Sequence, residues 1–112
     1  MKALILSLIL FTLNSSEREE YDIDEIYEKI DLDYGTLDED GDDIDFLFSP
    51  TTIKQGTYEV EITDGPGDLY EIKGTNYYLK FRSYYGYAGY GDEGILIIGS
   101  NTYSSKFVKF DD

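Results

Sequence analysis

The chemistry open to this chain is limited first by two residue types that it lacks. Among its 112 residues there is no histidine and no cysteine, so the commonest general base and the best protein nucleophile are both missing. Two carboxylates could still hydrolyse a glycoside if they faced each other across a cleft. Asp92 and Glu93 are adjacent, however, and neighbouring side chains of an extended segment point apart. We therefore predict a protein that is not an enzyme and has no resident cofactor.

Aspartates crowd the segment 33–45, and calcium takes oxygen ligands from loops of this kind. If Gly41 is placed at the invariant glycine of the helix–loop–helix calcium loop, Thr36 falls where the first aspartate belongs. Leu47 then falls where the bidentate glutamate belongs, so this motif is not matched. A looser calcium site would use four residues: Asp38, Asp40, Asp42 and Asp43. The alternative interpretation of the segment is a solvated acidic linker.

The most distinctive local feature is a loop rich in glycine and tyrosine, residues 84–91. Tyrosine combines an apolar ring with a polar hydroxyl, and with glycine it forms adaptable recognition surfaces at low entropic cost. The candidate binding residues are Tyr84, Tyr85, Tyr87 and Tyr90. Their rings could stack on a sugar or on the side chains of a partner protein. The alternative is that two of the four turn inward and cap the core.

The net charge of −15 is concentrated in one segment. Residues 17–45 contain 15 acidic and 2 basic residues, whereas residues 46–112 contain 9 acidic and 6 basic residues. Phosphate groups would be repelled by such a chain, so we expect neither nucleic acid nor an anionic lipid surface as a partner. A cation or a basic protein surface is electrostatically favoured. We also predict that the acidic segment folds back over the basic row formed by Tyr78, Lys80 and Arg82.

The N-terminal residues predict export. Met1 and Lys2 precede an apolar run, residues 3–13, which is too short for a helix that crosses a bilayer, and Asn14, Ser15 and Ser16 follow it. This order of positive, apolar and small polar residues is typical of a signal peptide. We predict that residues 1–16 are a signal peptide and that the mature protein is secreted or periplasmic, without membrane insertion. The alternative is a buried strand or helix of the fold.

Residues 17–45 are predicted to form an acidic helix and linker. Four side chains have the i, i+3, i+4, i+7 spacing of one helical face: Ile23, Ile26, Tyr27 and Ile30. Asp22 and Glu25 have the spacing of a capping box. We therefore predict a short amphipathic helix within residues 16–31, whose apolar face must dock on the rest of the protein because so short a helix is marginal alone.

Residues 46–112 are predicted to be a β domain. Apolar and polar residues alternate in three consecutive segments separated by turns, which indicates a meander: 55–63, 69–73 and 77–82. Residues 95–98 are apolar on both faces, as in a strand covered on both sides. The predicted fold is mainly β, a small antiparallel barrel or two-layer sheet of five to six strands preceded by the short amphipathic helix.

These observations predict an exported, non-enzymatic β module that binds a protein or a glycan at the cell envelope through the loop 84–90. The alternative function is a calcium-responsive protein whose acidic segment orders on binding the cation.

Overall fold

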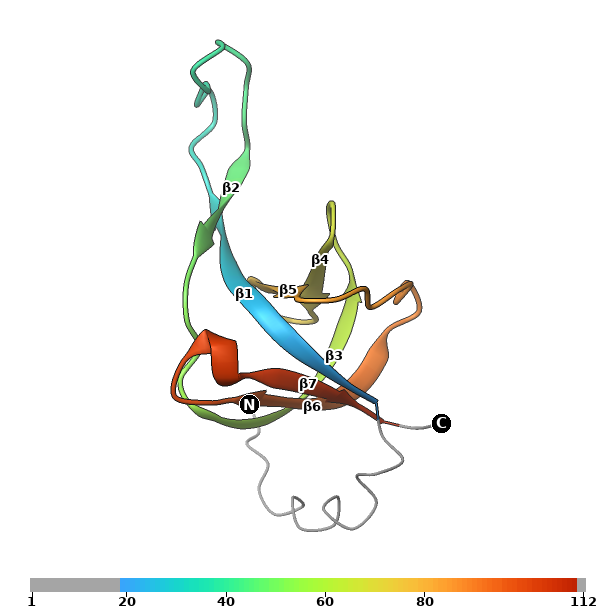
Figure 1. Ribbon diagram of the computed structural model, residues 1–112. Coiled ribbons are helices and arrows are strands. Elements are labelled where there is room, and N and C mark those ends of the chain that lie inside the picture. The colour runs from blue at the N-terminus through green and yellow to red at the C-terminus, as the bar shows by residue number, and fades with distance from the viewer. Residues whose placement is uncertain (1–18, 111–112) are drawn as a thin grey trace.

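A computed structural model describes residues 19–110 of the chain (Figure 1). The predicted signal peptide lies outside the described residues. The described part forms seven strands and one turn of 3₁₀ helix: β1 (Glu19–Asp31), β2 (Phe46–Pro50), β3 (Gly56–Asp64), β4 (Leu69–Ile72), β5 (Tyr77–Phe81), β6 (Asp92–Ile98), η2 (Thr102–Ser104) and β7 (Lys106–Lys109).

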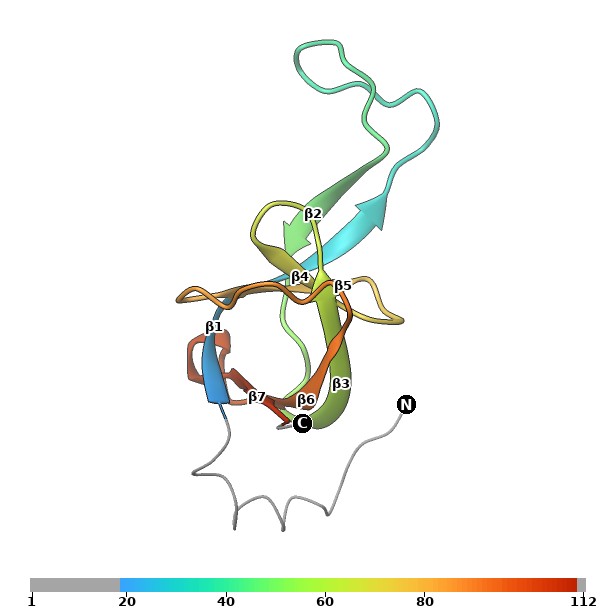
Figure 2. The same ribbon diagram turned by 90° about the vertical axis from the view of Figure 1, so that its right-hand side faces the viewer.

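Six of these strands close into an antiparallel barrel. Around the barrel the order is β1, β5, β4, β3, β6 and β7, and β7 pairs again with β1. Figure 2 shows this ring of strands from a second side. Closure removes most of the unpaired strand edges that an open sheet of this size would expose. The prediction of a mainly β fold is confirmed. Of the two predicted architectures, the barrel and the two-layer sheet, the protein adopts the barrel, with β2 as one extra strand.

The predicted helix within residues 16–31 is wrong, because residues 19–31 form β1, the longest strand. The misleading spacing comes from a β-bulge: the pairing of β1 with β5 shifts between Ile23 and Glu25. One extra residue at a bulge interrupts the two-residue alternation of a strand. Ile23 and Ile26 are therefore both buried inside the barrel although they lie three residues apart.

The predicted meander is confirmed. β3 pairs with β4, and β4 pairs with β5, both antiparallel and in chain order. The connecting turns contain Gly67 and Gly74, whose φ angles are +62° and +84°. This left-handed region strains residues that carry a Cβ, so glycine fits these turns.

The barrel is filled mainly by isoleucine, leucine and aromatic side chains. The buried residues of the core cluster come from β1, β3, β4, β5, β6 and β7: Ile23, Ile26, Ile62, Ile72, Leu79, Phe81, Leu96, Ile98 and Phe107. The prediction of a strand covered on both sides also holds for β6, where Ile95, Leu96 and Ile98 are all buried.

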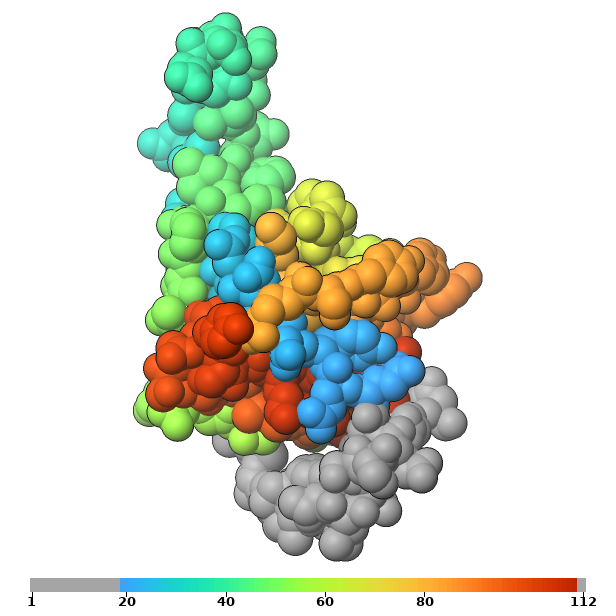
Figure 3. Space-filling model, viewed as in Figure 1, coloured from blue at the N-terminus to red at the C-terminus, as the bar shows by residue number. Residues whose placement is uncertain are grey.

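The second half of β1 leaves the barrel and pairs with β2, and together they form a projecting arm, residues 27–50 (Figure 1). The predicted linker, residues 32–45, is irregular and forms the tip of this arm, with one isolated bridge between Leu37 and Asp43. The arm is visible as the narrow extension of the space-filling view (Figure 3). It gives the molecule its long dimension of 54 Å, against 26 and 23 Å in the other two directions.

An aromatic contact fixes the base of the arm against the barrel. The ring of Phe48 in β2 lies 4.8 Å from the ring of Tyr78 in β5, in an edge-to-face arrangement. Tyr78 is buried by its surroundings although it belongs to the predicted basic row. Because edge-to-face rings at this distance attract each other, the arm is held in a defined direction at its base.

Candidate functional site

The four tyrosines of the predicted binding loop do not share one environment. Tyr84, Tyr87 and Tyr90 are 89%, 71% and 93% exposed. Tyr85 instead packs against the core cluster. One ring therefore serves the core and three remain on the surface, whereas the alternative considered from the sequence had two rings turned inward.

Tyr85 attaches the loop to the barrel through its ring and its hydroxyl. The ring stacks on Phe81 at a centroid distance of 4.8 Å and lies 4.4 Å from the ring of Tyr21. Its hydroxyl donates to Asp92 Oδ2 over 2.8 Å. Burial, followed by the hydrogen bond to this carboxylate, raises the pKa of Tyr85 above its usual value. The phenol stays protonated at neutral pH, which is the state that donates this bond.

Further hydrogen bonds fix the backbone of the loop. The Tyr70 hydroxyl donates to the carbonyl of Gly86 over 2.5 Å, and the amide of Ala88 donates to Asp64 Oδ1 over 2.9 Å. Gly86 has a φ of +107°, a conformation that residues with a Cβ rarely adopt. The loop is therefore anchored at three successive points, and its exposed rings stand on a fixed backbone.

Tyr84 lies at the edge of a groove of about 560 Å³. Its other aromatic lining residues are Tyr70, Phe81 and Tyr85, and its charged lining residues are Asp24, Asp68, Lys80 and Arg82. A volume of this size suits a small ligand or a few units of a chain. Tyr84 therefore combines an exposed ring with polar groups on the same concave surface.

Tyr87 and Tyr90 form a separate pair. Their ring centroids are 5.9 Å apart and the rings are nearly perpendicular, at 85°. Neither residue lines the groove beside Tyr84. The loop thus presents two distinct surfaces, Tyr84 with the groove and the Tyr87–Tyr90 pair.

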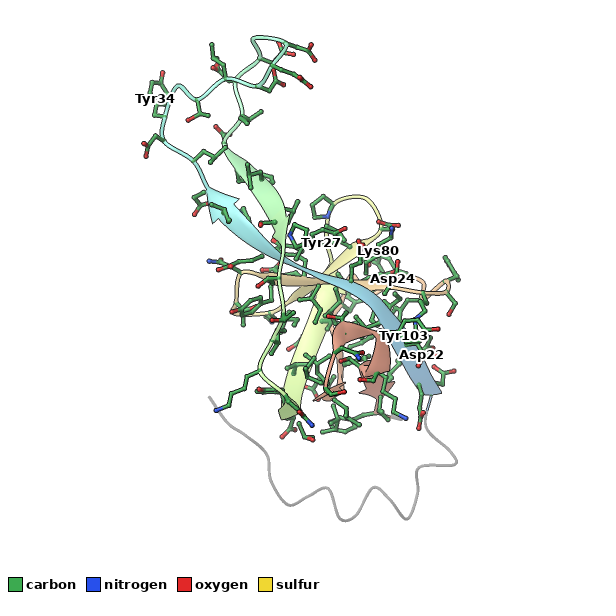
Figure 4. The ribbon with its side chains drawn as sticks, turned by 60° about the vertical axis from the view of Figure 1, so that its left-hand side comes forward. Asp22, Asp24, Tyr27, Tyr34, Lys80 and Tyr103 are labelled. Atoms are coloured by element: carbon green, nitrogen blue, oxygen red, sulfur yellow. The ribbon has the colours of Figure 1, made fainter. Side chains whose placement is uncertain are left out.

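Charged side chains beside the groove are arranged along β1 and β5 (Figure 4). Lys80 Nζ lies 4.0 Å from Asp24 Oδ2, and both side chains remain partly exposed. An exposed pair at this distance contributes about 0–1 kcal/mol. Both groups can therefore exchange partners with a ligand at little energetic cost.

Arg82, in contrast, is held by several partners. Its guanidinium lies 4.0 Å from the ring centroid of Tyr103, and its Nη1 lies 3.5 Å from Asp22 Oδ2. The guanidinium also donates to the carbonyls of Ile23 and Tyr103. Because of these interactions, the Arg82 side chain is held in place at the groove, whereas the Lys80 ammonium group can bind a ligand.

The acidic segment meets the predicted basic row only in part. Asp22 and Asp24 lie against Arg82 and Lys80 because β1 pairs with β5. Glu19 and Glu20 pair with β7 instead, and residues 27–45 belong to the arm. Neither Asp24 nor Asp68 is predictable as a groove residue, since the sequence predicts a helix at Asp24 and Asp68 falls in the turn between the segments 55–63 and 69–73.

The four candidate calcium ligands lie at the tip of the arm. The Asp38 carboxylate accepts hydrogen bonds from the amides of Asp40 and Asp42, over 2.8 and 3.0 Å. Within residues 19–110, no group of three or more acidic side chains is placed to hold a metal ion. Asp38, Asp40, Asp42 and Asp43 therefore form a local turn here and do not converge on one point.

Comparisons with protein families, with characterised proteins and with solved structures find no match to this chain. No helix in the described part of the chain is long and apolar enough to cross a membrane. The geometry of the groove and the loop is therefore the basis for assigning a function.

Proposed function

We propose that this protein is an exported, non-enzymatic binding module that recognises a glycan in the groove beside Tyr84. The observation that carries the proposal is the position of Tyr84: a ring that is 89% exposed stands at the edge of a groove of about 560 Å³ lined by carboxylates and a lysine.

A sugar ring has an apolar face of C–H groups and a rim of hydroxyls. The exposed ring of Tyr84 offers a flat apolar surface for the first. Asp24 and Asp68 can accept hydrogen bonds from hydroxyls, and Lys80 can donate them. The groove thus supplies both kinds of contact within one concave surface, which is the usual design of a site for a small polar ligand.

The charge of the protein restricts the kind of glycan. With a net charge of −15, the molecule repels sulfated or uronic-acid polymers over distances of about a Debye length, near 8–10 Å in physiological salt. A neutral oligosaccharide or one with free amino groups meets no such repulsion. We therefore assign the groove to a neutral or amino sugar.

The non-enzymatic part of the proposal is supported by the residue types present. The chain has neither histidine nor cysteine, and the Asp92 carboxylate is already engaged by the Tyr85 hydroxyl and lies 3.8 Å from Lys109 Nζ. Export is supported by the sequence of residues 1–16. Amino-terminal sequencing of the protein recovered from its native compartment tests export. A mature chain that still begins at Met1 would contradict export through a cleaved signal peptide.

A protein partner is the second candidate, favoured by the Tyr87–Tyr90 pair. Exposed tyrosines on a fixed, protruding loop are typical of protein-recognition surfaces. Because this pair lies outside the groove, the two candidates predict different sensitive residues.

Isothermal titration with chitohexaose, cellohexaose and chitosan oligomers tests the proposal, with heparin as the anionic control. Tyr84→Ala should weaken binding at least tenfold, about 1.4 kcal/mol. Tyr90→Ala is the matched control, since it removes an equally exposed ring from the same loop, and it should leave glycan affinity unchanged. Equal losses in both variants, or heparin as the best ligand, would refute the assignment to this groove.

A further inference from the structure

The wall of the barrel is incomplete beside the first half of β3. β6 pairs with β3 from Gly56 to Ile62, but β4 pairs with β3 only from Ile62 to Asp64. The stretch of β3 before Glu61 therefore has a neighbouring strand on one side only. A cavity of about 540 Å³ lies along this side.

The free side of β3 carries backbone N–H and C=O groups that form no hydrogen bond with any other described residue. The carbonyl of Glu61 accepts from the amide of Lys73 over 2.9 Å, so Glu61 faces away from β6. In an antiparallel ladder alternate residues face the same side. Thr57 and Glu59 therefore also present their N–H and C=O groups to the cavity, and β3 ends its pairing on this side at Glu61.

The hydrogen bonds between β6 and β7 show independently which residues of β3 face the cavity. The carbonyl of Glu93 accepts from the amide of Phe110 over 2.9 Å, so Glu93 faces β7. Gly94 and the alternate residues after it then face β3. Their partners in the register are Val60, Tyr58 and Gly56, which leaves Thr57 and Glu59 facing the cavity.

The side chains around this edge are apolar within and acidic at the rim. Tyr58, Val60 and Ile72 line the cavity and belong to the core or pack against it. The charged lining residues are Glu59, Glu61, Glu93 and Lys73, and Lys73 Nζ already lies 3.7 Å from Glu61 Oε2. The rim therefore carries an excess of negative charge beside a row of open hydrogen-bonding groups.

We propose that this cavity binds an extended, basic segment of another protein, which adds as a strand to the free edge of β3. The open backbone groups of Thr57 and Glu59 repeat every two residues, about 6.8 Å along a strand, which is the period of an extended peptide. Alternate side chains of the added strand would enter the apolar cavity, and the others, if basic, would meet the glutamates. A small ligand would not use hydrogen-bonding groups spaced in this way.

A second copy of this chain is a poor occupant of the edge. Two identical β3 edges placed side by side would bring their Glu59 and Glu61 side chains together, and like charges on adjacent strands are destabilising. The cavity is also separate from the groove beside Tyr84, since the two share no lining residue. Binding of a peptide at β3 and binding of a glycan in the groove are therefore independent of each other.

Hydrogen exchange of the whole protein tests whether the edge is free. The amides of Thr57 and Glu59 should exchange quickly, whereas those of Tyr58 and Val60 should be protected at least a hundredfold more strongly. Protection of all four amides in the free protein would overturn the proposal, because the edge would then be already occupied.

A synthetic peptide of alternating lysine and valine is the probe for binding. It should protect the amides of Thr57 and Glu59, and methylation of every second peptide nitrogen should weaken binding at least tenfold. A peptide of alternating glutamate and valine is the charge control and should bind at least tenfold more weakly. Equal binding of the methylated and unmethylated peptides, or protection at some other edge alone, would refute strand addition at β3.

Two variants separate the backbone edge from the charge. Glu59→Pro removes an amide that faces the cavity and takes no part in the ladder with β6, so an edge strand tolerates it. It should abolish binding of the probe. Glu93→Lys keeps the edge, should weaken binding severalfold, and remains informative if the proline variant fails to fold. Unchanged affinity in a folded Glu59→Pro variant would contradict the proposal.

Discussion

Replacing Tyr85 by phenylalanine removes the single hydroxyl that joins the loop to Asp92. The hydroxyl lies 2.8 Å from Asp92 Oδ2, and the aromatic contacts of the ring remain possible in the variant. A hydrogen bond to a charged group contributes about 1.5–3 kcal/mol. Asp92 keeps Lys109 Nζ at 3.8 Å, so its charge stays partly compensated. We expect the free energy of unfolding at pH 7 to fall by about 2 kcal/mol.

The difference between the two proteins should depend on pH. The pKa of Tyr85 is raised in the folded protein, first by burial and then by its bond to Asp92, whereas in the unfolded chain it is near 10. The stability that this group contributes is therefore fully present below pH 10 and is lost as the pH rises toward the folded pKa. The loss reaches about 1.4 kcal/mol at pH 11. The phenylalanine variant has no phenol at this position and so does not undergo this loss. The difference in the free energy of unfolding between the two proteins should therefore shrink to about 0.6 kcal/mol at pH 11.

Urea unfolding at pH 7, 9, 10 and 11, followed by circular dichroism, measures this convergence. Tyr90→Phe is the control, because its ring is 93% exposed and its hydroxyl should contribute nothing measurable at pH 7. A difference between wild type and Tyr85→Phe that stays constant from pH 9 to 11 would refute the reasoning, since it would mean that Tyr85 titrates alike in the folded and unfolded chains.

Three further perturbations test other parts of the structure. Gly94→Ala should destabilise the barrel by roughly 3 kcal/mol or more in thermal unfolding, because the new Cβ would overlap the carbonyl of Val108 and the ring of Phe107. Phe48→Ala should speed proteolysis within the arm while the barrel stays resistant, since the ring contact at the base of the arm is lost. Calcium at millimolar concentration should not raise the melting temperature, because Asp38 already bonds the local backbone and the described acidic residues form no metal group; a rise absent with magnesium would contradict this.

The sequence was sufficient for the elements whose pattern is local. Strands β3, β4 and β5 alternate cleanly and are separated by turns in which Gly67 and Gly74 need positive φ angles, so each strand and its neighbour could be predicted from adjacent residues. β6 was recognisable as a strand covered on both sides because four consecutive apolar residues leave it no polar face.

β1 could not be predicted because its pattern depends on a partner far away in the chain. A bulge between Ile23 and Glu25 exists only where β1 meets β5, and it produces a three-residue spacing that also occurs in helices. The capping-box residues, Asp22 and Glu25, are outward-facing strand residues here. Local propensity therefore gave a consistent but wrong answer, and the non-local pairing decided the structure.

The candidate site was predictable only in composition. The tyrosine-rich loop stood out from the sequence, but the inward turn of Tyr85 depends on Tyr21, Phe81 and Phe107, which come from three other strands. The same limit applies to Asp24 and Asp68. Each belongs to the groove because a distant strand or turn brings it beside Tyr84, and no motif within the sequence records that proximity.

Stability and recognition are coupled through two neighbouring residues of the loop. Tyr85 packs against the core cluster, whereas the ring of Tyr84, the residue before it, is 89% exposed. The insertion of Tyr85 and the bond from Tyr70 to Gly86 hold the loop before any ligand arrives, so little ordering opposes binding. Tyr84→Ala should therefore reduce glycan affinity without lowering the melting temperature, whereas Tyr85→Ala should reduce both. Loss of stability without loss of affinity in Tyr85→Ala would mean that the loop holds its shape without the core, and the coupling argued from the structure would be wrong.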